Sequence, residues 1–591
     1  MTHHPTRPTL QGTFGMAAST HWLATASAQS VLERGGNACD AAVAAGFALH
    51  IVEPHLNGPG GDLTGVFATA TDPTPRVLCG QGPAPADATI EYYRSIGLDA
   101  VPGAGVLAAA IPGAVDAWLL LLRDHGTWEL SEVLDYALGY ARAGHPVLPR
   151  VVATLERVRD LFTEHWTTSA AQWLPSGHVP KPGELIRNET YAAVLDRLIV
   201  AGSVSATREE RIDAARREWG HGFVAEAVDR FVATPTRHSL GTDHAGVITG
   251  NDLAGFAAHV EDAVTMDFRG HTVAKTGAWG QGPALLQALA IIDGFDDADL
   301  DPSTANGAHL ILETLKLAMA DREAYYGDVD VPLKHLLSAD YAASRRSLIT
   351  DDASHEIRPG VVDGYRPYRP AAAVSVESPE VIATIGEPTI SRDGETRGDT
   401  CHVDVVDRWG NIASITPSGG WLQSSPTIPE LGFCLGTRLQ MTWLDPAAPS
   451  ALRPGVRPRT TLPPTLLLRD GLPVAALGTP GGDGQDQWQL LYLLRVLVGG
   501  MDAQDAIDAP AFRTTSMASS FWPRTWTPGG ADVEDRLGAD VIDDLERRGH
   551  VVTRTGPWSQ GRLSTVTRDP ATGLLSAAAN PRGRQGYAAG R

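Results

Sequence analysis

The sequence is poor in cysteine and has no metal-binding spacing. Four cysteines, Cys39, Cys79, Cys401 and Cys434, are spread over 591 residues. They are too few and too dispersed for a disulfide framework. No CxxC pair and no HExxH motif is present among the 19 histidines, so the spacing predicts no metal site.

Basic residues and long apolar runs are also scarce. The chain has 48 Lys+Arg against 69 Asp+Glu, a formal net charge of −21. Binding to nucleic acid or to an anionic membrane needs a basic surface, so the sequence argues against both partners. Apolar runs end well before the roughly 18 residues that span a bilayer. The N-terminal stretch lacks the pattern of a secretory signal. We therefore expect a cytoplasmic protein.

The composition that is present belongs to a globular chain. Hydrophobic residues make up 43% and charged residues 20%, enough apolar material for a large core. The length favours either about four domains or one large sandwich with insertions. Asn37 is placed to cap a helix over 40–52. Apolar spacing predicts further helices over 114–124, 130–143, 283–293 and 309–321, the last two amphipathic.

The character of the chain changes near residue 400. The polar stretch 375–399 contains Pro379 and Pro388 and is predicted to be an exposed, mobile segment. Alternating residues over 401–406 and 412–416 then predict a β-hairpin, and 463–468 with 474–477 predict another strand pair. Thr400 therefore stands where a mobile segment enters the first strand of a sheet.

Thr400 has the chemistry of a conditional nucleophile. A threonine hydroxyl is weakly nucleophilic, but an N-terminal threonine can use its own α-amine as the base. An α-amine has a pKa of about 8, which suits a general base near neutral pH. The spacing alone favours an ordinary threonine at the start of a strand. Cys401, next to it, is interpreted as a strand-filling residue.

Two further motifs could serve an acyl-transfer reaction. In Thr479-Pro480-Gly481-Gly482-Asp483-Gly484, consecutive glycines after an apolar strand can aim backbone N–H groups at an oxyanion. A plain β-turn is the alternative. In Arg457-Pro458-Arg459-Thr460-Thr461, the two hydroxyls could bind substrate or oxyanion, or be structural.

Five segments resemble one family in order along nearly the whole chain. GDTCHVDVVDRWGNIASITPS resembles the processing site and first hairpin of the γ-glutamyltranspeptidase family, whose members are N-terminal nucleophile hydrolases. GGNACDAAVAAGFALHIVEPHLNGPGGD and HLILETLKLAMADREAYYGD resemble its N-terminal motif and central helix. RPRTTLPPTLLLRDG and GTPGGDGQ resemble its late strands.

This resemblance implies an α/β (α+β) fold, a four-layer αββα sandwich made as one inactive chain. The chain would cut itself between Asp399 and Thr400. Residues 1–399 would form the large subunit and 400–591 the small one, and the two would stay associated. A homo-oligomer of that heterodimer is left open, and no metal or organic cofactor is needed.

The resemblance also implies roles for individual residues. Thr400 matches the nucleophile and Ser418 a second hydroxyl that bonds to it. Gly481 and Gly482 match the oxyanion-hole glycines. Thr460 and Thr461 match a hydroxyl pair that holds the substrate carboxylate.

The chain departs from the family where an amino-acid substrate would bind. Gln81 stands about where the family has an arginine that clamps the glutamate carboxylate, and a neutral amide cannot replace that charged fork. Gly420 replaces an asparagine. The acidic motif for the α-ammonium is replaced by 436–443, which contains Arg438. Arg438 could supply a cation for a substrate carboxylate or lie on the surface.

These departures favour a small-molecule amide over a γ-glutamyl compound. The stretch PSGGWLQSSPTIPELGFCLGTRLQMTWLD is similar to the oxamate amidohydrolase branch of the family. The leading hypothesis is a self-processing amidohydrolase of a small carboxylated amide, with oxamate as the candidate. The alternatives are a glutathione hydrolase or γ-glutamyltransferase, an acylase with Trp421, Trp443 and Phe433 lining an apolar pocket, and a non-catalytic binding relative.

Overall fold

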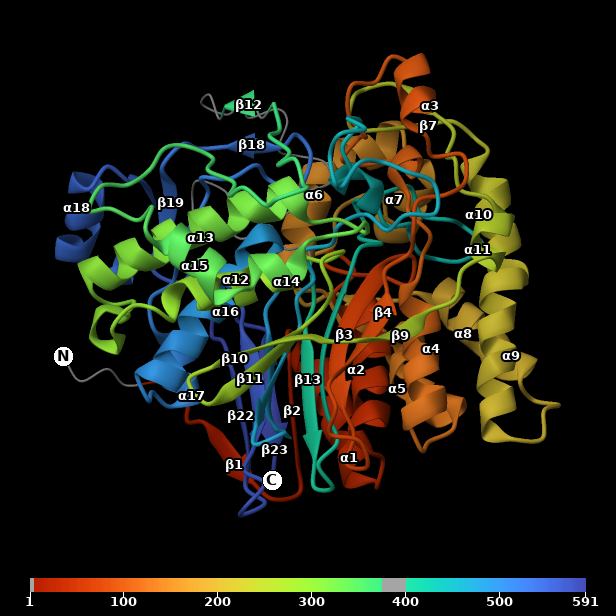
Figure 1. The fold of residues 1–591 in the computed structure, drawn as a ribbon. Coiled ribbons are helices and arrows are strands. Elements are labelled where there is room, and N and C mark those ends of the chain that lie inside the picture. Colours follow the sequence, from red (N-terminus) through yellow and green to blue (C-terminus); the bar gives the residue numbers. More distant parts are fainter. Residues whose placement is uncertain (1–4, 372, 375–399) are drawn as a thin grey trace.

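The computed structural model describes residues 5–371, 373–374 and 400–591 (Figure 1). The stretch 375–399, which the sequence predicts to be mobile, lies outside the described residues, and so does Asp399. Within the described ranges, no helix is both long and apolar enough to cross a membrane.

Two antiparallel sheets of seven strands form the centre of the molecule. The first sheet has the order β23 (Tyr587–Gly590), β2 (Gly15–Ser19), β13 (Val403–Asp407), β14 (Ile412–Ser418), β3 (Asp62–Ala68), β4 (Arg76–Gly80) and β9 (His259–Asp262). The second has the order β1 (Leu10–Gly12), β22 (Leu575–Ala579), β21 (Ser564–Arg568), β16 (Leu472–Gly478), β15 (Thr465–Arg469), β11 (His271–Lys275) and β10 (Val264–Phe268).

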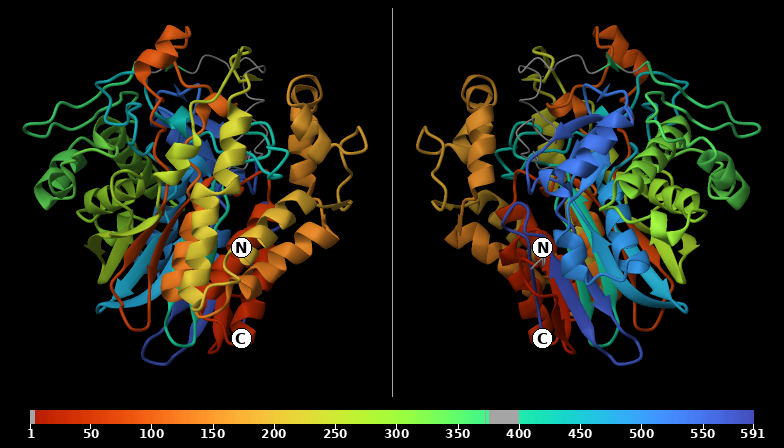
Figure 2. Two further views of the ribbon diagram at one scale, coloured as in Figure 1. Left: turned by 90° about the vertical axis from the view of Figure 1, so that its right-hand side faces the viewer. Right: turned by 90° about the vertical axis from the view of Figure 1, so that its left-hand side faces the viewer.

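Helices cover the outer face of each sheet, on opposite sides of the molecule (Figure 2). The first sheet is covered by α1 (Trp22–Glu33), α2 (Ala38–Val52), α4 (Ala114–His125), α5 (Leu130–Ala143), α8 (Glu189–Ala201), α9 (Arg208–His221) and α10 (Phe223–Val232). The second is covered by α12 (Gly282–Ile292), α13 (Ala305–Tyr325), α16 (Gln485–Leu493) and α18 (Ala539–Arg547).

A third apolar cluster lies between the sheets and holds them together. It includes Met16 and Val66 of the first sheet and Leu466 and Ala476 of the second, all fully buried. Side chains alternate across a strand, so each strand supplies one face to this cluster and one to the helices. The layers run helix, sheet, sheet, helix, which confirms the predicted αββα sandwich.

The remaining helices and strands lie outside the four layers, some of them at the upper end in Figure 1, where β13 begins. The helices are α3 (Ile90–Ser95), α6 (Pro149–Glu164), α7 (Thr167–Trp173), α11 (Gly250–Ala254), α14 (Leu333–Leu336), α15 (Ala339–Arg346) and α17 (Ala503–Asp508). The strands are β5 (His145–Pro146), β6 (Leu185–Ile186), β7 (Thr236–Arg237), β8 (Asp243–His244), β12 (Ala373–Val374), β17 (Phe512–Thr514), β18 (Thr525–Trp526), β19 (Gly530–Val533) and β20 (Val551–Arg554).

Local sequence signals set several elements as predicted. Asn37 caps α2: its side chain accepts from the backbone N–H of Cys39 and Asp40, and Asp40 completes the capping box. Helices α4 and α5 and both predicted strand pairs are present. The helices predicted over 283–293 and 309–321 are present as α12 and within α13. Their predicted amphipathic character is wrong, because both helices are buried along nearly their whole length.

Charged side chains inside α13 find buried partners. Lys316 Nζ donates to Glu313 Oε1 at 2.6 Å, and Arg459 Nη2 donates to Glu323 Oε2 at 2.6 Å. An ion pair of this kind lets a charged residue sit in a covered helix. Spacing along a single helix cannot reveal such partners, since Arg459 comes from a distant segment.

Candidate active site

The first hairpin brings Thr400 and Ser418 together. Thr400 lies three residues before β13, Ser418 ends β14, and their backbones form an isolated bridge. The two side-chain oxygens lie 3.2 Å apart, and either can donate. Both residues are buried, at 1% exposure. The pairing of opposite strands therefore places the two predicted hydroxyls within hydrogen-bonding distance.

The glycine turn lies against the same end of the hairpin. A Cβ built on Gly478, the last residue of β16, would come within 2.2 Å of the His402 ring, two residues after Thr400. Gly481 and Gly482 follow with φ of 131° and 53°. A Cβ on Gly481 would lie 2.1 Å from the ring of Trp488. Only glycine fits at Gly481, and the turn begins three residues after the contact of Gly478 with His402.

An ionic network holds the glycine turn in place. Asp483 pairs with Arg322 of α13, and its Oδ2 accepts the backbone N–H of Ser520 at 2.8 Å. Arg322 also donates to Gln281 Oε1 at 2.9 Å. All these groups are buried. Buried ion pairs and hydrogen bonds of this kind restrain the side chain of Asp483 and with it the turn.

Thr460 and Thr461 lie in a buried loop before β15. Thr460 is fixed by Gln281 N, which donates to its carbonyl at 2.9 Å, and its hydroxyl accepts from Leu462 N at 3.2 Å. The hydroxyl oxygen of Thr461 is buried without a hydrogen-bond partner. Of the predicted pair, Thr461 therefore has the hydroxyl that remains available to a ligand.

Arg438 points inward and is already paired. Its Nε and Nη2 donate to the two carboxylate oxygens of Asp62 at 2.6 and 3.1 Å. Asp62 begins β3 opposite Ser418, so this pair borders the Thr400 hairpin. Burial raises the pKa of Asp62 against the opposing charge of Arg438. At 3% exposure, Arg438 is not the surface arginine that the sequence left as an alternative.

Gln81 and Gly420 are both buried. Gln81 directly follows β4 at 1% exposure, with its Oε1 unpartnered. Gly420 has φ of 64°, and a Cβ there would lie 2.8 Å from the backbone nitrogen of Gly61. A larger residue at Gly420 would collide with that loop, so no side chain is available to contact substrate at this position.

The polar contacts of Cys401 were not predicted from the sequence. The Cys401 thiol donates to Glu53 Oε2 at 3.1 Å and accepts from Asn57 Nδ2 at 3.1 Å. Glu53 also accepts from Thr20 Oγ1 at 2.6 Å and from Gln585 Nε2 at 3.1 Å. Cys401 therefore does more than fill a strand. The signal was present in the Gly- and Pro-rich stretch after α2, which carries several polar residues.

A second missed feature extends from Thr400 between the sheets. His402 Nδ1 lies 2.8 Å from Thr416 Oγ1, and His402 Nε2 lies 2.8 Å from Asp404 Oδ1. Ser564 Oγ donates to Asp404 Oδ2 at 2.8 Å. These residues share the face of the hairpin that carries Thr400 and Ser418. They form a buried polar chain beneath the two hydroxyls.

The three aromatic residues proposed for an acylase pocket are dispersed. Phe433 stacks on Trp219 within the helical layer. Trp443 Nε1 donates to Glu323 Oε1 at 2.7 Å, whereas Trp421 Nε1 donates to Leu56 O at 2.8 Å. Each aromatic residue therefore has its own packing role.

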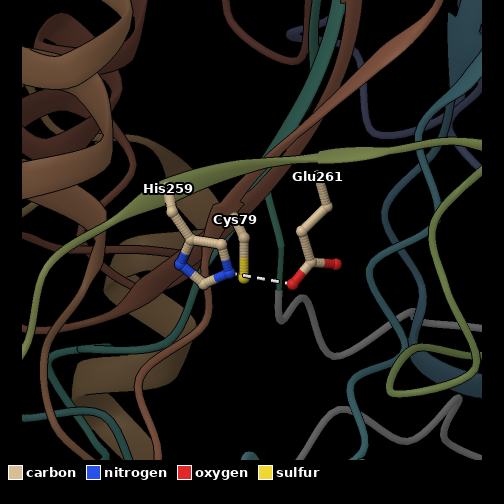
Figure 3. A group of neighbouring side chains, drawn as sticks. All are labelled: Cys79, His259 and Glu261. Carbon is tan, nitrogen blue, oxygen red and sulfur yellow. Dashed lines mark hydrogen bonds and ion pairs between the residues drawn. The ribbon is translucent and has the colours of Figure 1, made fainter.

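Cys79, His259 and Glu261 are close enough to hold one metal ion (Figure 3). Arg457 Nη1, however, donates to Cys79 Sγ at 3.1 Å and to Glu261 Oε1 at 2.6 Å. Burial also raises the pKa of the Cys79 thiol. A metal ion would have to displace the guanidinium and a thiol proton, so this trio fits a metal poorly. It borders a cavity of about 680 Å³ that Gln81 also lines.

Comparison with known proteins identifies relatives along the whole chain. The family model described as Gamma-glutamyltranspeptidase matches residues 24–590. The oxamate amidohydrolase proenzyme of Klebsiella pneumoniae subsp. pneumoniae is 30% identical, over 98% of this chain and 98% of its own length. The glutathione hydrolase proenzyme of Bacillus subtilis (strain 168) is 29% identical, over 98% of this chain and 92% of its own.

Two solved structures extend the comparison to the fold. The protein in the structure of LmbA2991HD has 54% sequence identity to this chain, and the two structures match with a TM-score of 0.94 over 100% of each chain. Cephalosporin acylase from Bacillus halodurans is 26% identical, with a TM-score of 0.82 and coverage of 100% of this chain and 98% of its own.

Proposed function

Because the chain belongs to the γ-glutamyltranspeptidase family, we propose that it is a self-processing amidohydrolase acting on a small carboxylated amide, with oxamate as the first candidate. The observation that carries the proposal is the 3.2 Å contact between Thr400 Oγ1 and Ser418 Oγ beside the glycine turn. A nucleophile, a hydroxyl that orients it and an oxyanion site are the parts that amide cleavage needs.

The first reaction is cleavage of the chain itself. Thr400 Oγ1 attacks the carbonyl carbon of Asp399 and gives up its proton, and the Thr400 amide nitrogen takes up that proton as its bond to the carbon breaks. The acyl group is then held as an ester on Thr400 Oγ1. Water hydrolyses the ester, which leaves residues 1–399 with a new carboxylate and residues 400–591 with a free α-amine. Ser418 Oγ holds the threonine hydroxyl in position.

The second reaction uses the new α-amine as the base. The amine takes the proton of Thr400 Oγ1 while that oxygen attacks the substrate amide carbon, and it passes the proton to the leaving nitrogen. Backbone N–H groups of Gly481 and Gly482 stabilise the negative oxygen of the tetrahedral intermediate. Water then releases the acyl group. For oxamate, the products are oxalate and ammonia.

The choice of a small carboxylated amide rests on what surrounds Thr400. Gln81 offers no charge for an amino-acid carboxylate, and Gly420 offers no side chain. The unpartnered hydroxyl of Thr461 can donate to a carboxylate or to the oxyanion. The Klebsiella relative, an oxamate amidohydrolase proenzyme, matches nearly all of this chain.

A glutathione hydrolase or γ-glutamyltransferase is the second candidate. The observation that favours it is the buried Asp62–Arg438 pair, which presents one carboxylate and one guanidinium beside Ser418. These two groups could receive the ammonium and carboxylate of an amino-acid head group. The substrate would have to compete with a preformed ion pair, which is why we rank this function second.

Mass spectrometry and ammonia release test the proposal together. Purified wild-type protein should yield fragments 1–399 and 400–591, and Thr400→Ala should remain one intact chain. Processed wild type should release ammonia from oxamate and leave glutathione uncut. Cleavage of glutathione without ammonia release from oxamate would establish the second candidate. An uncut wild-type chain that is inactive on both would contradict the catalytic assignment and favour a binding relative.

A further inference from the structure

Arg562 is a buried cation without a bonding partner. It lies two residues before β21 at 3% exposure. None of its Nε, Nη1 and Nη2 atoms has a hydrogen-bond partner. Most other deeply buried arginines in the described part of the chain are paired, for example Arg459 with Glu323. A buried guanidinium with no acceptor is strongly unfavourable, so this side chain calls for an anion.

The position of Arg562 links it to the catalytic turn. Its backbone N–H donates to Thr479 Oγ1 at 2.9 Å, and Thr479 directly precedes the turn with Gly481 and Gly482. A Cβ built on Gly583 would lie 3.1 Å from Arg562 Cδ and 3.7 Å from Arg150 Nη2. Arg150, in the first turn of α6, therefore approaches Arg562 across the space left by this glycine.

One carboxylate, that of Glu53, lies among the titratable groups near Arg562. Burial favours protonation of Glu53, yet the basic groups around it, Arg562 included, hold its pKa below the usual range. Burial lowers the pKa of His21 to about 4 and of His55 to about 3, so both rings are neutral at pH 7. The three guanidinium nitrogens of Arg562 are therefore available to hydrogen-bond a further anion.

The neighbouring polar atoms also lack partners. Both ring nitrogens of His55 and Nε2 of His21 are buried without a hydrogen bond. Cys401, directly after Thr400, contacts Glu53 in the same group. Several unsatisfied polar atoms in one place mark a site for water or a polar ligand. The cluster therefore has unsatisfied polar atoms that a ligand can bind, and Cys401 connects it to Thr400.

We propose that Arg562 binds a carboxylate on the acyl part of the substrate while the amide carbon lies at Thr400. Arginine suits this task because its planar fork accepts a carboxylate in two parallel hydrogen bonds. The family-like positions cannot provide the same charge: Arg438 is paired with Asp62, and Gln81 is neutral. This inference rests on the proposed amidohydrolase function and assigns the cation that its substrate needs.

The kinetic test compares acids with matched neutral amides. Wild type, Arg562→Gln and the control Arg584→Gln, an exposed arginine in the nearby loop, are assayed for ammonia release. The substrates are oxamate, malonamate, succinamate and glutaramate, each beside its neutral diamide. On the acid that wild type prefers, Arg562→Gln should lose about 30- to 100-fold in kcat/KM, the scale of one charged hydrogen-bonded pair.

The neutral diamides and the control variant set the limits of this result. Arg562→Gln should hydrolyse the neutral diamides at rates within about twofold of wild type, because these substrates lack the carboxylate that Arg562 would bind. Arg584→Gln should resemble wild type on every substrate, because Arg584 is exposed and outside the proposed site. An equal loss on acids and neutral diamides would overturn the carboxylate site, because it would indicate a general defect in the turn. No loss on any acid would overturn it as well.

A binding measurement keeps this inference separate from the proposed function. Oxalate and glutarate are titrated into processed protein by calorimetry. Binding to wild type that weakens at least about tenfold in Arg562→Gln supports the anion site, even if no amide is hydrolysed and the proposed function fails. Equal or absent binding in both proteins overturns the site even if oxamate is hydrolysed. If Arg562→Gln does not fold, Arg562→Lys takes its place, with the same outcomes, because a lysine cannot form the two-pronged contact.

Discussion

Asp62 and Arg438 form a two-pronged ion pair next to the backbone bridge that joins Thr400 to Ser418. The carboxylate is the first residue of β3, and the guanidinium comes from the short turn after residue 437. The pair therefore ties a segment of the C-terminal part to a strand of the N-terminal part at the candidate active site. Its two charges are mutually dependent, because each is buried with the other as its main partner.

The Asp62→Asn variant should be markedly less stable than wild type. Breaking a buried ion pair by removing one partner costs about 3–5 kcal/mol, because the other charge stays buried and unpaired. Urea unfolding of wild type, Asp62→Asn and the double variant Asp62→Asn/Arg438→Met measures this cost. The double variant should recover part of the loss. Equal stability of Asp62→Asn and wild type would show that Arg438 finds another acceptor.

Ser418→Ala should slow the reaction without abolishing the fold. Among the described residues, Ser418 places its hydroxyl within hydrogen-bonding distance of Thr400 Oγ1. A hydrogen bond to a reacting or charged group is worth about 1.5–3 kcal/mol, so kcat should fall about 10- to 100-fold. Cleavage of the chain, followed by gel electrophoresis over time, should slow as well. Ser418→Thr, which restores a hydroxyl, should recover both rates, and failure to do so would argue for a packing role.

Gly481→Ala should displace the oxyanion turn. The added Cβ would lie 2.1 Å from the Trp488 ring, at a φ of 131°. Losing one oxyanion donor lowers kcat about 100- to 1000-fold in other enzymes, and we expect a loss of that order. Gly500→Ala is the matched control, since Gly500 also has positive φ, 63°, but open space around it. Similar loss of activity in both variants would mean that backbone strain alone, not the turn near Thr400, is responsible.

Acid should destabilise the protein partly through His50. Burial lowers the pKa of His50 to about 3, against 6.5 in the unfolded chain. The neutral ring therefore contributes stability that is complete above pH 6.5 and is lost as the pH falls toward 3. When the pH is lowered from 6.5 to 5, the unfolding free energy of wild type should fall by about 2 kcal/mol more than that of His50→Gln. Urea unfolding at both pH values measures this, and parallel pH profiles would contradict it.

Much of the architecture could be predicted because local signals and tertiary packing agree. The cap at Asn37 and the alternating runs on either side of the turn 407–411 each specify their own element. The hydroxyl pair of Thr400 and Ser418 follows from the hairpin register, which short turns fix. Roles assigned by family resemblance, including cleavage at Asp399, stay predictions until the experiments above are made.

The contacts that could not be predicted join residues far apart in the chain. Arg438 meets Asp62 across 376 residues, and Cys401 meets Glu53 across 348. Arg562 gave no sequence signal at all, since an arginine before a strand is usually exposed. The charged interior of α13 was missed for the same reason: burial depends on what covers a helix as well as on its own periodicity.

The strand order has a consequence for how this protein can be made. In the first sheet, β13 and β14 of the C-terminal part lie between β2 and β3 of the N-terminal part, and the second sheet is interleaved in a similar way. If the chain is cut after residue 399, neither piece contains all the strands of either sheet. Two separately synthesised pieces would have to find each other while unfolded, which replaces an intramolecular search by a bimolecular one. The sheets can thus form by folding of one chain only before the cut. After full denaturation, the cut protein should refold far less readily than the uncut Thr400→Ala variant.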